Sequence, residues 1–268
     1  MNEFAINHCT ITPVRQEPSE GSEQLTQLLF AEVCEVLDRL PRWTKIRSTV
    51  DGQEGWVDFK MLSDWKRDDV KLNGRRDLES EGVVSVPIAI ATNMETGEEL
   101  MLTLGTRLPN YAHGTFEVLS KQYLIDPTMV KSDRSEVKGE MICTVAQSLI
   151  NTPYLWGGKN AMGIDCSGFT QVVYAAMGIN LLRNAREQIT QGEVVHSLAE
   201  AQPGDLAFFD HADRDPKATN ISHVGLLLDN KKIIHCSGCV HVDDIDEMGI
   251  HLPDGELTHH LVQIKRYL

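Results

Sequence analysis

Apolar side chains recur at helical spacing in one stretch of the second half of the chain. They would share one face of a helix, and Gly178 follows at the position where a helix commonly ends. The pattern therefore predicts a helix that begins at about Cys166, and a second helix is expected over residues 141–150. The apolar positions of the first helix are Phe169, Val172, Val173 and Ala176.

A buried strand, a turn and a second strand follow further along the chain. Residues 222–228 are typical of a buried strand, residues 229–231 of a turn, and residues 232–235 of the returning strand. A hairpin folds back on itself, so His223 near its start and His235 near its end are expected to lie close together. The two histidines are therefore candidates for one site.

The first half of the chain contains short strand-like runs divided by turns and charged segments. Strands so short and evenly spaced are typical of small β barrels. A charged stretch over residues 64–77 and a polar linker over residues 131–138 separate the runs. We therefore expect three domains, at 1–63, 64–130 and 131–268. The predicted strands are 27–30, 31–37, 43–47 and 55–58 in the first domain and 83–86, 88–91, 100–104 and 115–119 in the second.

Length and charge restrict the classes of function. The chain has 268 residues and a formal net charge of −14, so electrostatic binding to nucleic acid or to an anionic membrane is not expected. No apolar run is long enough to span a membrane. Residues 1–8 show no secretory signal, which predicts a cytoplasmic protein if Met1 is the native start. Six cysteines without regular spacing fit a reducing compartment.

Cys166 is the candidate nucleophile, because glycines bracket it and the predicted helix begins at it. The free N–H groups and the positive dipole end of a helix stabilise a thiolate, so the pKa of Cys166 is expected to be lowered. A nucleophilic thiol also needs a base. In the simplest assignment His223 is the general base. His235 then forms a hydrogen bond with the far ring nitrogen of His223 and fixes its tautomer and orientation.

Cys236 and Cys239 form a C-x-x-C pair, which is also found in redox dithiols and zinc sites. A redox pair is expected where a strand meets a helix, and residues 241–244 have no helical pattern. A structural zinc site needs two more ligands at short spacing, and the sequence offers isolated histidines. The pair is therefore weak evidence for either function.

Four motifs in this order resemble those of the NlpC/P60 cysteine peptidases. The resemblance implies a papain-like catalytic domain with Cys166, His223 and His235 as the catalytic triad. It also places Tyr154 near the oxyanion and makes Trp156 a candidate substrate-binding residue, and it implies no metal and no cofactor. The motifs are P-Y-L-W-G-G at 153–158, D-C-S-G-F at 165–169, P-G-D-L-A-F-F at 203–209 and H-V-G at 223–225, within residues 139–268.

The first domain resembles a bacterial SH3-like domain, through F-A-E at 30–32, W-T-K-I at 43–46 and G-W-V at 55–57. The second β-rich segment is expected to be another copy, although it keeps few of these landmarks. The fold class expected for the whole chain is therefore α+β, with two small all-β SH3-like barrels before the peptidase domain.

Peptidases of this family that carry SH3-like domains include enzymes that cut the γ-D-glutamyl–diamino acid bond of murein peptides. The resemblance implies that Asp165, Ser167 and Glu32 bind the free ammonium group of L-Ala in such a peptide. Carboxylates and a hydroxyl suit a cation and leave no room for a continued chain. The expected partner is a murein-derived peptide, and a monomer is favoured.

Two departures from the family pattern bear on specificity. Asn184 and Ala185 replace the Asp and Ser of an L-P-R-D-S-x-x-Q segment, and Gln53 replaces the tyrosine of G-Y-x-G-W. Two other classes of function stay open on the sequence alone. The chain could be a thiol amidase or acyltransferase that acts on another amide, or a catalytically weak module that binds cell-wall peptides.

Overall fold

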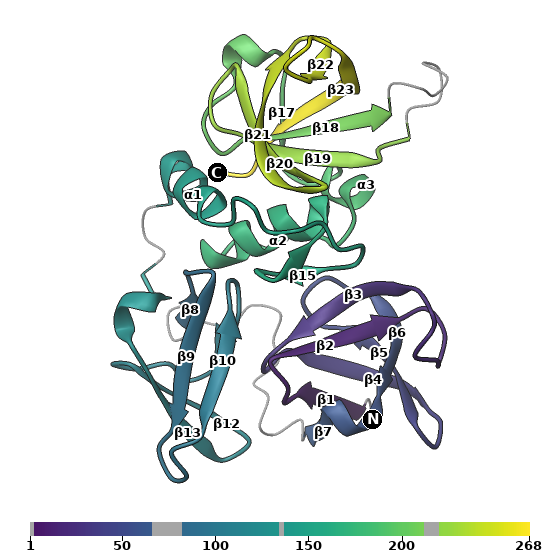
Figure 1. The fold of residues 1–268 in the computed structure, drawn as a ribbon. Helices are drawn as coiled ribbons and strands as arrows, with labels where there is room; N and C mark the ends of the chain where they lie inside the picture. The colour runs from purple at the N-terminus through teal and green to yellow at the C-terminus, as the bar shows by residue number, and fades with distance from the viewer. Residues whose placement is uncertain (1–2, 66–81, 134–136, 212–219) are drawn as a thin grey trace.

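The computed structural model describes residues 3–65, 82–133, 137–211 and 220–268. Figure 1 shows a sheet formed by the first residues, two small sheets beside it, and a barrel with helices at the C-terminal end. Helices α1 (Gly139–Gln147) and α2 (Cys166–Ala176) lie between the barrel and the two smaller β-rich parts. In the described ranges, no helix has the length and apolar character that a membrane crossing needs.

Residues 3–65 form a seven-stranded sheet in the order β3-β2-β6-β5-β4-β1-β7. Buried and half-buried side chains alternate along β2 and β6, as a sheet with one covered face requires. Gly55 lies against β2, where an added Cβ would be 2.5 Å from Val14 Cγ1. The strands are β1 (Glu3–Asn7), β2 (Ile11–Arg15), β3 (Gln24–Leu29), β4 (Val33–Arg39), β5 (Trp43–Ser48), β6 (Glu54–Asp58) and β7 (Leu62–Trp65), with a 3-10 helix η1 (Phe59–Met61).

The strands predicted at 43–47 and 55–58 are confirmed as β5 and β6. The strand predicted to begin at residue 31 begins at Val33 instead, because Ala31 has φ 62° and belongs to a tight turn. Glu32 therefore lies between this turn and β4, outside the strand and its strict in–out alternation of side chains.

Residues 82–131 form two separate sheets, in the orders β10-β9-β13-β12 and β11-β8-β14. Their core is shared with the first sheet, since Phe30 packs edge to face against both Phe116 and Tyr123. The identification of this part as a second SH3-like barrel stays a prediction. The strands are β8 (Gly82–Val84), β9 (Ile88–Asn93), β10 (Glu99–Thr103), β11 (Arg107–Leu108), β12 (Thr115–Val118), β13 (Lys121–Ile125) and β14 (Val130–Lys131), with η4 (Pro127–Met129).

The C-terminal part is built on a closed six-stranded barrel in the order β23-β18-β19-β20-β21-β22, which the β22–β23 pairing closes. Helix α2 packs against β19, and its apolar residues Phe169, Val172 and Val173 are buried, as predicted. The elements are β15 (Lys159–Asn160), β16 (Gly163–Ile164), α3 (Ala185–Gln188), β17 (Glu193–Val195), η5 (Leu198–Glu200), β18 (Leu206–His211), β19 (His223–Leu227), β20 (Lys232–Ser237), β21 (Cys239–Asp246), β22 (Gly249–His251) and β23 (Leu257–Arg266).

Two sequence predictions fall partly outside the described residues. Most of the charged stretch at 64–77 does so, and so does the middle of the linker at 131–138. The predicted helix over 141–150 is confirmed as α1, shifted by a few residues toward the N-terminus.

Candidate active site

Cys166 is the first residue of α2, and Asp165 caps the helix by accepting a hydrogen bond of 2.7 Å from the Gly168 backbone N–H. Glycine is needed at 168, because an added Cβ would lie 2.2 Å from the carbonyl oxygen of Gly158. Gly157 has φ 71° and lies against the backbone of Gln24. The glycines that bracket the cysteine therefore allow tight backbone packing on both sides.

The thiol of Cys166 does not have the lowered pKa that the helix start predicts. Burial and the neighbouring carboxylate of Asp165 raise the pKa of Cys166 to about 12, against weaker opposite effects from the Val224 backbone, Arg183 and the Ser167 backbone. The side chain is only 8% exposed, so lost hydration outweighs the helix dipole. That expectation was wrong, and the thiol needs a base to become a nucleophile.

The predicted hairpin brings the two histidines together. In the β19–β20 pairing Gly225 lies opposite His235, and His223 Nε2 is 2.8 Å from His235 Nδ1. Cys166 makes a hydrogen bond with the backbone of Val224, the residue that follows His223. The nucleophile and both histidines thus lie in one buried region, as the sequence predicted, and their catalytic roles stay predictions.

Asp243 extends this chain of groups and was missed from the sequence. His235 Nε2 lies 3.1 Å from Asp243 Oδ2. The hydrogen bond from His235 lowers the pKa of Asp243, so the carboxylate is an acceptor, while burial lowers the pKa of His235 and keeps its ring neutral. His235 then carries its proton on Nε2, and its Nδ1 accepts from His223 Nε2–H. This leaves the lone pair of neutral His223 on Nδ1.

His259 is a second residue that sequence reasoning missed. It is buried on β23, and its ring lies 4.5 Å from the ring of His223, centroid to centroid. The contact exists because β23 closes the barrel, a long-range pairing without a local sequence signal.

Asp165 and Ser167 are both engaged by Arg183, which is 1% exposed. The guanidinium donates to Asp165 Oδ1 at 3.0 Å, to Asp165 Oδ2 at 2.6 Å and to Ser167 Oγ at 3.0 Å. The Gly157 N–H donates to the same carboxylate at 2.9 Å. A carboxylate offers about four acceptor positions, so those of Asp165 are filled. Its predicted binding of a substrate ammonium group stays a prediction and would require one of these donors to move.

Glu32 lies at the contact between the first sheet and the helical part, but it faces Lys159 rather than Asp165. Lys159 Nζ is 2.9 Å from Glu32 Oε1 and 3.2 Å from Oε2, and both side chains are buried. Burial raises the pKa of Glu32 despite the lysine. Asp51, half-buried nearby, keeps a lowered pKa because Lys159 and a hydrogen bond from Gln171 outweigh the cost of burial.

Further hydrogen bonds join the first sheet to the segment around Cys166. Gln27 Oε1 accepts from the backbone N–H of Lys159 and from Asn160 Nδ2, each at 2.8 Å. The two departures from the family pattern also meet here, since Asn184 Nδ2 donates to Gln53 Oε1 at 3.4 Å. The first sheet therefore lines the region next to the candidate nucleophile.

The two aromatic candidates differ in their surroundings. Tyr154 is half-buried, and burial together with the nearby Cys166 and Asp165 raises the pKa of its hydroxyl, which therefore keeps its proton. Trp156 is 61% exposed, and its indole Nε1 donates to Glu23 at 2.8 Å. A protonated hydroxyl near Cys166 suits an oxyanion donor, and an exposed indole beside the first sheet suits a substrate contact; both roles stay predictions.

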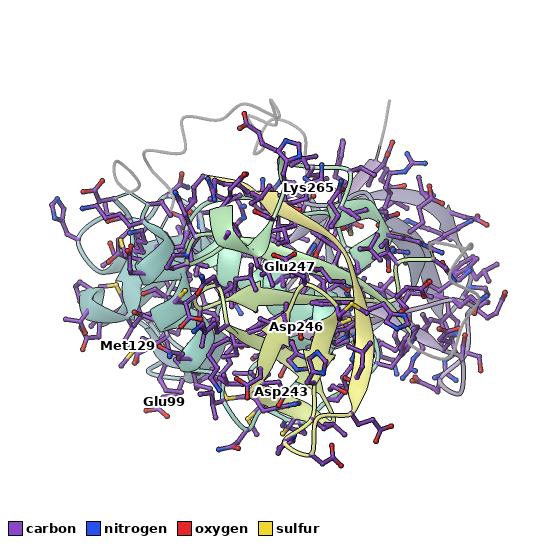
Figure 2. All side chains as sticks on the ribbon, turned by 90° about the horizontal axis from the view of Figure 1, so that it is seen from above. Glu99, Met129, Asp243, Asp246, Glu247 and Lys265 are labelled. Atoms are coloured by element: carbon purple, nitrogen blue, oxygen red, sulfur yellow. The ribbon has the colours of Figure 1, made fainter. Side chains whose placement is uncertain are left out.

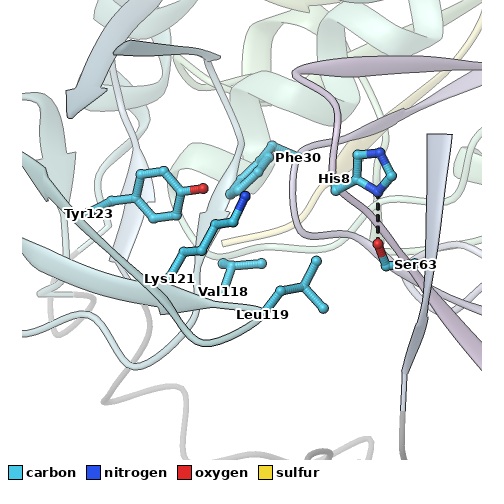
Figure 3. Close-up of a pocket in the computed structure, with 7 residues that line it drawn as sticks. All are labelled: His8, Phe30, Ser63, Val118, Leu119, Lys121 and Tyr123. Carbon is cyan, nitrogen blue, oxygen red and sulfur yellow. Dashed lines mark hydrogen bonds between the residues drawn. The ribbon is translucent and has the colours of Figure 1, made fainter. Parts of the chain in front are cut away.

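Cys236 and Cys239 are free thiols in the structure. Cys236 is buried and its Sγ donates to the Ile164 carbonyl at 3.3 Å, while Cys239 is half-buried at the start of β21. A separate pocket of about 330 Å³ lies between the first and second β-rich parts (Figure 3), and none of the predicted site residues lines it. Its lining residues are His8, Phe30, Ser63, Val118, Leu119, Lys121 and Tyr123.

Comparison with known proteins identifies two segments of the chain. The NlpC/P60 family matches residues 151–261, and the bacterial SH3 domain matches residues 12–63. Gamma-D-glutamyl-L-lysine dipeptidyl-peptidases of Bacillus subtilis and Bacillus cereus are 28% and 29% identical, each over 78% of this chain, which spans 71% and 66% of their lengths. A crystal structure of a Bacillus cereus NlpC/P60 family protein superposes with a TM-score of 0.82 at 19% identity, over 99% of each chain. That likeness concerns the fold.

Proposed function

Because this chain carries an NlpC/P60 cysteine peptidase domain and a bacterial SH3 domain, we propose that it hydrolyses the γ-D-glutamyl–diamino acid bond of murein peptides and releases L-Ala-D-Glu. The observation that carries the proposal is the buried group of Cys166, His223 and His235 beside the SH3 domain. The names of the two Bacillus relatives support this bond as the target.

The reaction follows from the protonation states of these groups. His223 Nδ1 takes the proton of the Cys166 thiol, and the thiolate attacks the γ-carbonyl carbon of D-Glu. Backbone N–H groups at the start of α2 and the Tyr154 hydroxyl stabilise the oxyanion. The C–N bond then breaks as His223 returns the proton to the amine of the diamino acid. Water, deprotonated by His223, hydrolyses the thioester and restores the thiol.

The charges at the SH3 contact support a preference for a free N-terminal amine. Glu32, Asp51 and Asp165 face two cations, Lys159 and Arg183, so the group has one more negative than positive charge when all five are ionised. A substrate ammonium would supply the missing positive charge, with Asp165, Ser167 and Glu32 as its partners. An N-acylated peptide would bring none. Intact murein strands, whose L-Ala is acylated, would therefore be poor substrates.

The test compares L-Ala-γ-D-Glu-diaminopimelate with its N-acetylated form, with products measured by mass spectrometry. We expect the free peptide to be cleaved at least roughly tenfold faster, since an unpaired buried charge costs a kilocalorie or more. Glu32→Gln should raise KM for the free peptide, while Glu35→Gln on β4, outside the contact, serves as the matched control. Equal cleavage of both peptides would support the proposed peptidase activity but contradict the preference for a free amine. Cleavage of neither would reject the proposed bond.

A further inference from the structure

Three potential metal ligands meet on the strands behind the catalytic histidine pair. His235 on β20 lies directly opposite His241 on β21, and Asp243 follows two residues later on the same face of β21. Asp243 Oδ2 lies 3.1 Å from His235 Nε2 and 3.1 Å from His241 Nε2, and the ligand atoms of all three lie within 4.8 Å of one another. Figure 2 labels Asp243 at the six-stranded barrel of the C-terminal part.

The spacing of these atoms is close to that of a zinc site. Zn²⁺ binds histidine nitrogen and carboxylate oxygen at about 2.0–2.2 Å in a tetrahedron, which separates neighbouring ligand atoms by about 3.3 Å. Two histidines and one carboxylate leave the fourth position to water. Two of the three separations, 3.1 Å each, are therefore close to the tetrahedral value, and the third, between the two Nε2 atoms, is at most 4.8 Å.

The surroundings of His241 resemble those of a metal ligand. Its Nδ1 lies 2.8 Å from the carbonyl oxygen of Cys239, which can only accept, so Nδ1 carries a proton and Nε2 faces Asp243. A second ring nitrogen that donates to a carbonyl is the usual way in which a protein orients a metal-binding histidine. The side chain of His241 is 33% exposed, whereas that of His235 is 2% exposed, so the cluster is open on the side of His241.

We propose that His235, His241 and Asp243 form an inhibitory Zn²⁺ site on the rear of the catalytic histidine pair. In the resting enzyme His235 Nε2 carries the proton, so the hydrogen bond of 2.8 Å runs from His223 Nε2–H to His235 Nδ1. Zn²⁺ replaces the proton on His235 Nε2. The neutral ring then carries its one proton on Nδ1. The hydrogen bond then runs the other way, and His223 must hold its proton on Nδ1.

Binding of the ion thereby removes the base without touching Cys166. The Nε2 proton of His235 leaves to water, the Nε2 proton of His223 shifts to His235 Nδ1, and water returns one proton to His223 Nδ1. His241 keeps its proton on Nδ1 and offers Nε2 to the ion, so no proton is released overall. His223 Nδ1 can no longer accept the thiol proton, and burial keeps Cys166 protonated on its own. The ion site itself does not depend on the proposed function; the loss of turnover does.

The binding test uses Co²⁺ absorption and Zn²⁺ calorimetry on the full chain with its thiols reduced. We expect one site in the wild type and in Cys166→Ala, with Co²⁺ bands of a tetrahedral ion and without the near-ultraviolet band of a cobalt–thiolate bond. His241→Ala should weaken this site roughly tenfold or more. His251→Ala is the matched control, because His251 pairs with Asp246 on the same barrel and is not one of the three proposed ligands. A thiolate band that disappears in Cys166→Ala, or unchanged affinity in His241→Ala, would overturn the proposal.

The predicted loss of the base is measured as the reactivity of Cys166, without a substrate. The alkylation rate of Cys166 by iodoacetamide, measured on its tryptic peptide, should fall at least roughly tenfold when Zn²⁺ fills the site. The rate should keep its zinc-free value in His241→Ala under the same conditions. Equal slowing in His241→Ala would overturn the switch. Because this readout needs no peptide hydrolysis, it separates failure of the zinc switch from failure of the proposed peptidase activity.

Discussion

Arg183→Met would test whether a buried ion pair holds the nucleophile's helix in place. The guanidinium donates to Asp165 at 2.6 and 3.0 Å, to Ser167 at 3.0 Å and, through Nε, to Thr26 Oγ1 at 2.7 Å. Methionine keeps much of the length of the side chain but leaves the Asp165 carboxylate buried without its cation. Removing one partner of such a buried pair lowers the free energy of unfolding by about 3–5 kcal/mol.

The free energy of unfolding is measured by urea denaturation, followed by tryptophan fluorescence. The double variant Arg183→Met/Asp165→Asn should recover part of the loss, because it removes the uncompensated charge. Arg47→Met is the control: Arg47 pairs with Glu54 and Glu35 at the surface, where water screens the charges, so we expect a much smaller effect. A loss below about 1 kcal/mol in Arg183→Met, or equal losses in Arg183→Met and Arg47→Met, would contradict a stabilising role for this buried ion pair.

Two further predictions concern the histidine pair and the buried thiols. His235→Ala should lower kcat by roughly 10²- to 10⁴-fold without abolishing turnover, because His223 loses the group that fixes its tautomer; an unchanged kcat, with an unchanged circular dichroism spectrum, would contradict this. Burial raises the pKa of Cys34, Cys166 and Cys236 to about 12 from 9.0, so above pH 9 the unfolded chain loses thiol protons that the folded chain keeps. Stability should therefore fall by about 1.4 kcal/mol per pH unit for each thiol, and a urea midpoint that is constant from about pH 8 to pH 10 would contradict it.

Local patterns were sufficient to predict the elements that carry the nucleophile and the histidines. The spacing of Phe169 and Val172 predicted α2, and a short turn between two apolar strands predicted that His223 and His235 meet. In both cases the residues concerned lie within about a dozen positions of one another along the chain. Their relative placement therefore follows from one helix or one hairpin.

Features that depend on distant segments could not be predicted in this way. Asp243 reaches His235 only through the register of β20 and β21, and His259 reaches His223 only because β23 closes the barrel. The pKa of Cys166 was predicted in the wrong direction for a related reason. The sequence shows the helix start, whereas the burial that dominates comes from the packing of α2 against β19.

The proposed function requires that Cys166 cleaves the γ-D-glutamyl bond with the help of His223. The most direct measurement is release of L-Ala-D-Glu from L-Ala-γ-D-Glu-diaminopimelate by the wild type, by Cys166→Ala and by Cys239→Ala, a half-buried thiol outside the triad. We expect turnover by the wild type and by Cys239→Ala, and none by Cys166→Ala in a protein that remains folded. Wild-type turnover in Cys166→Ala would contradict it.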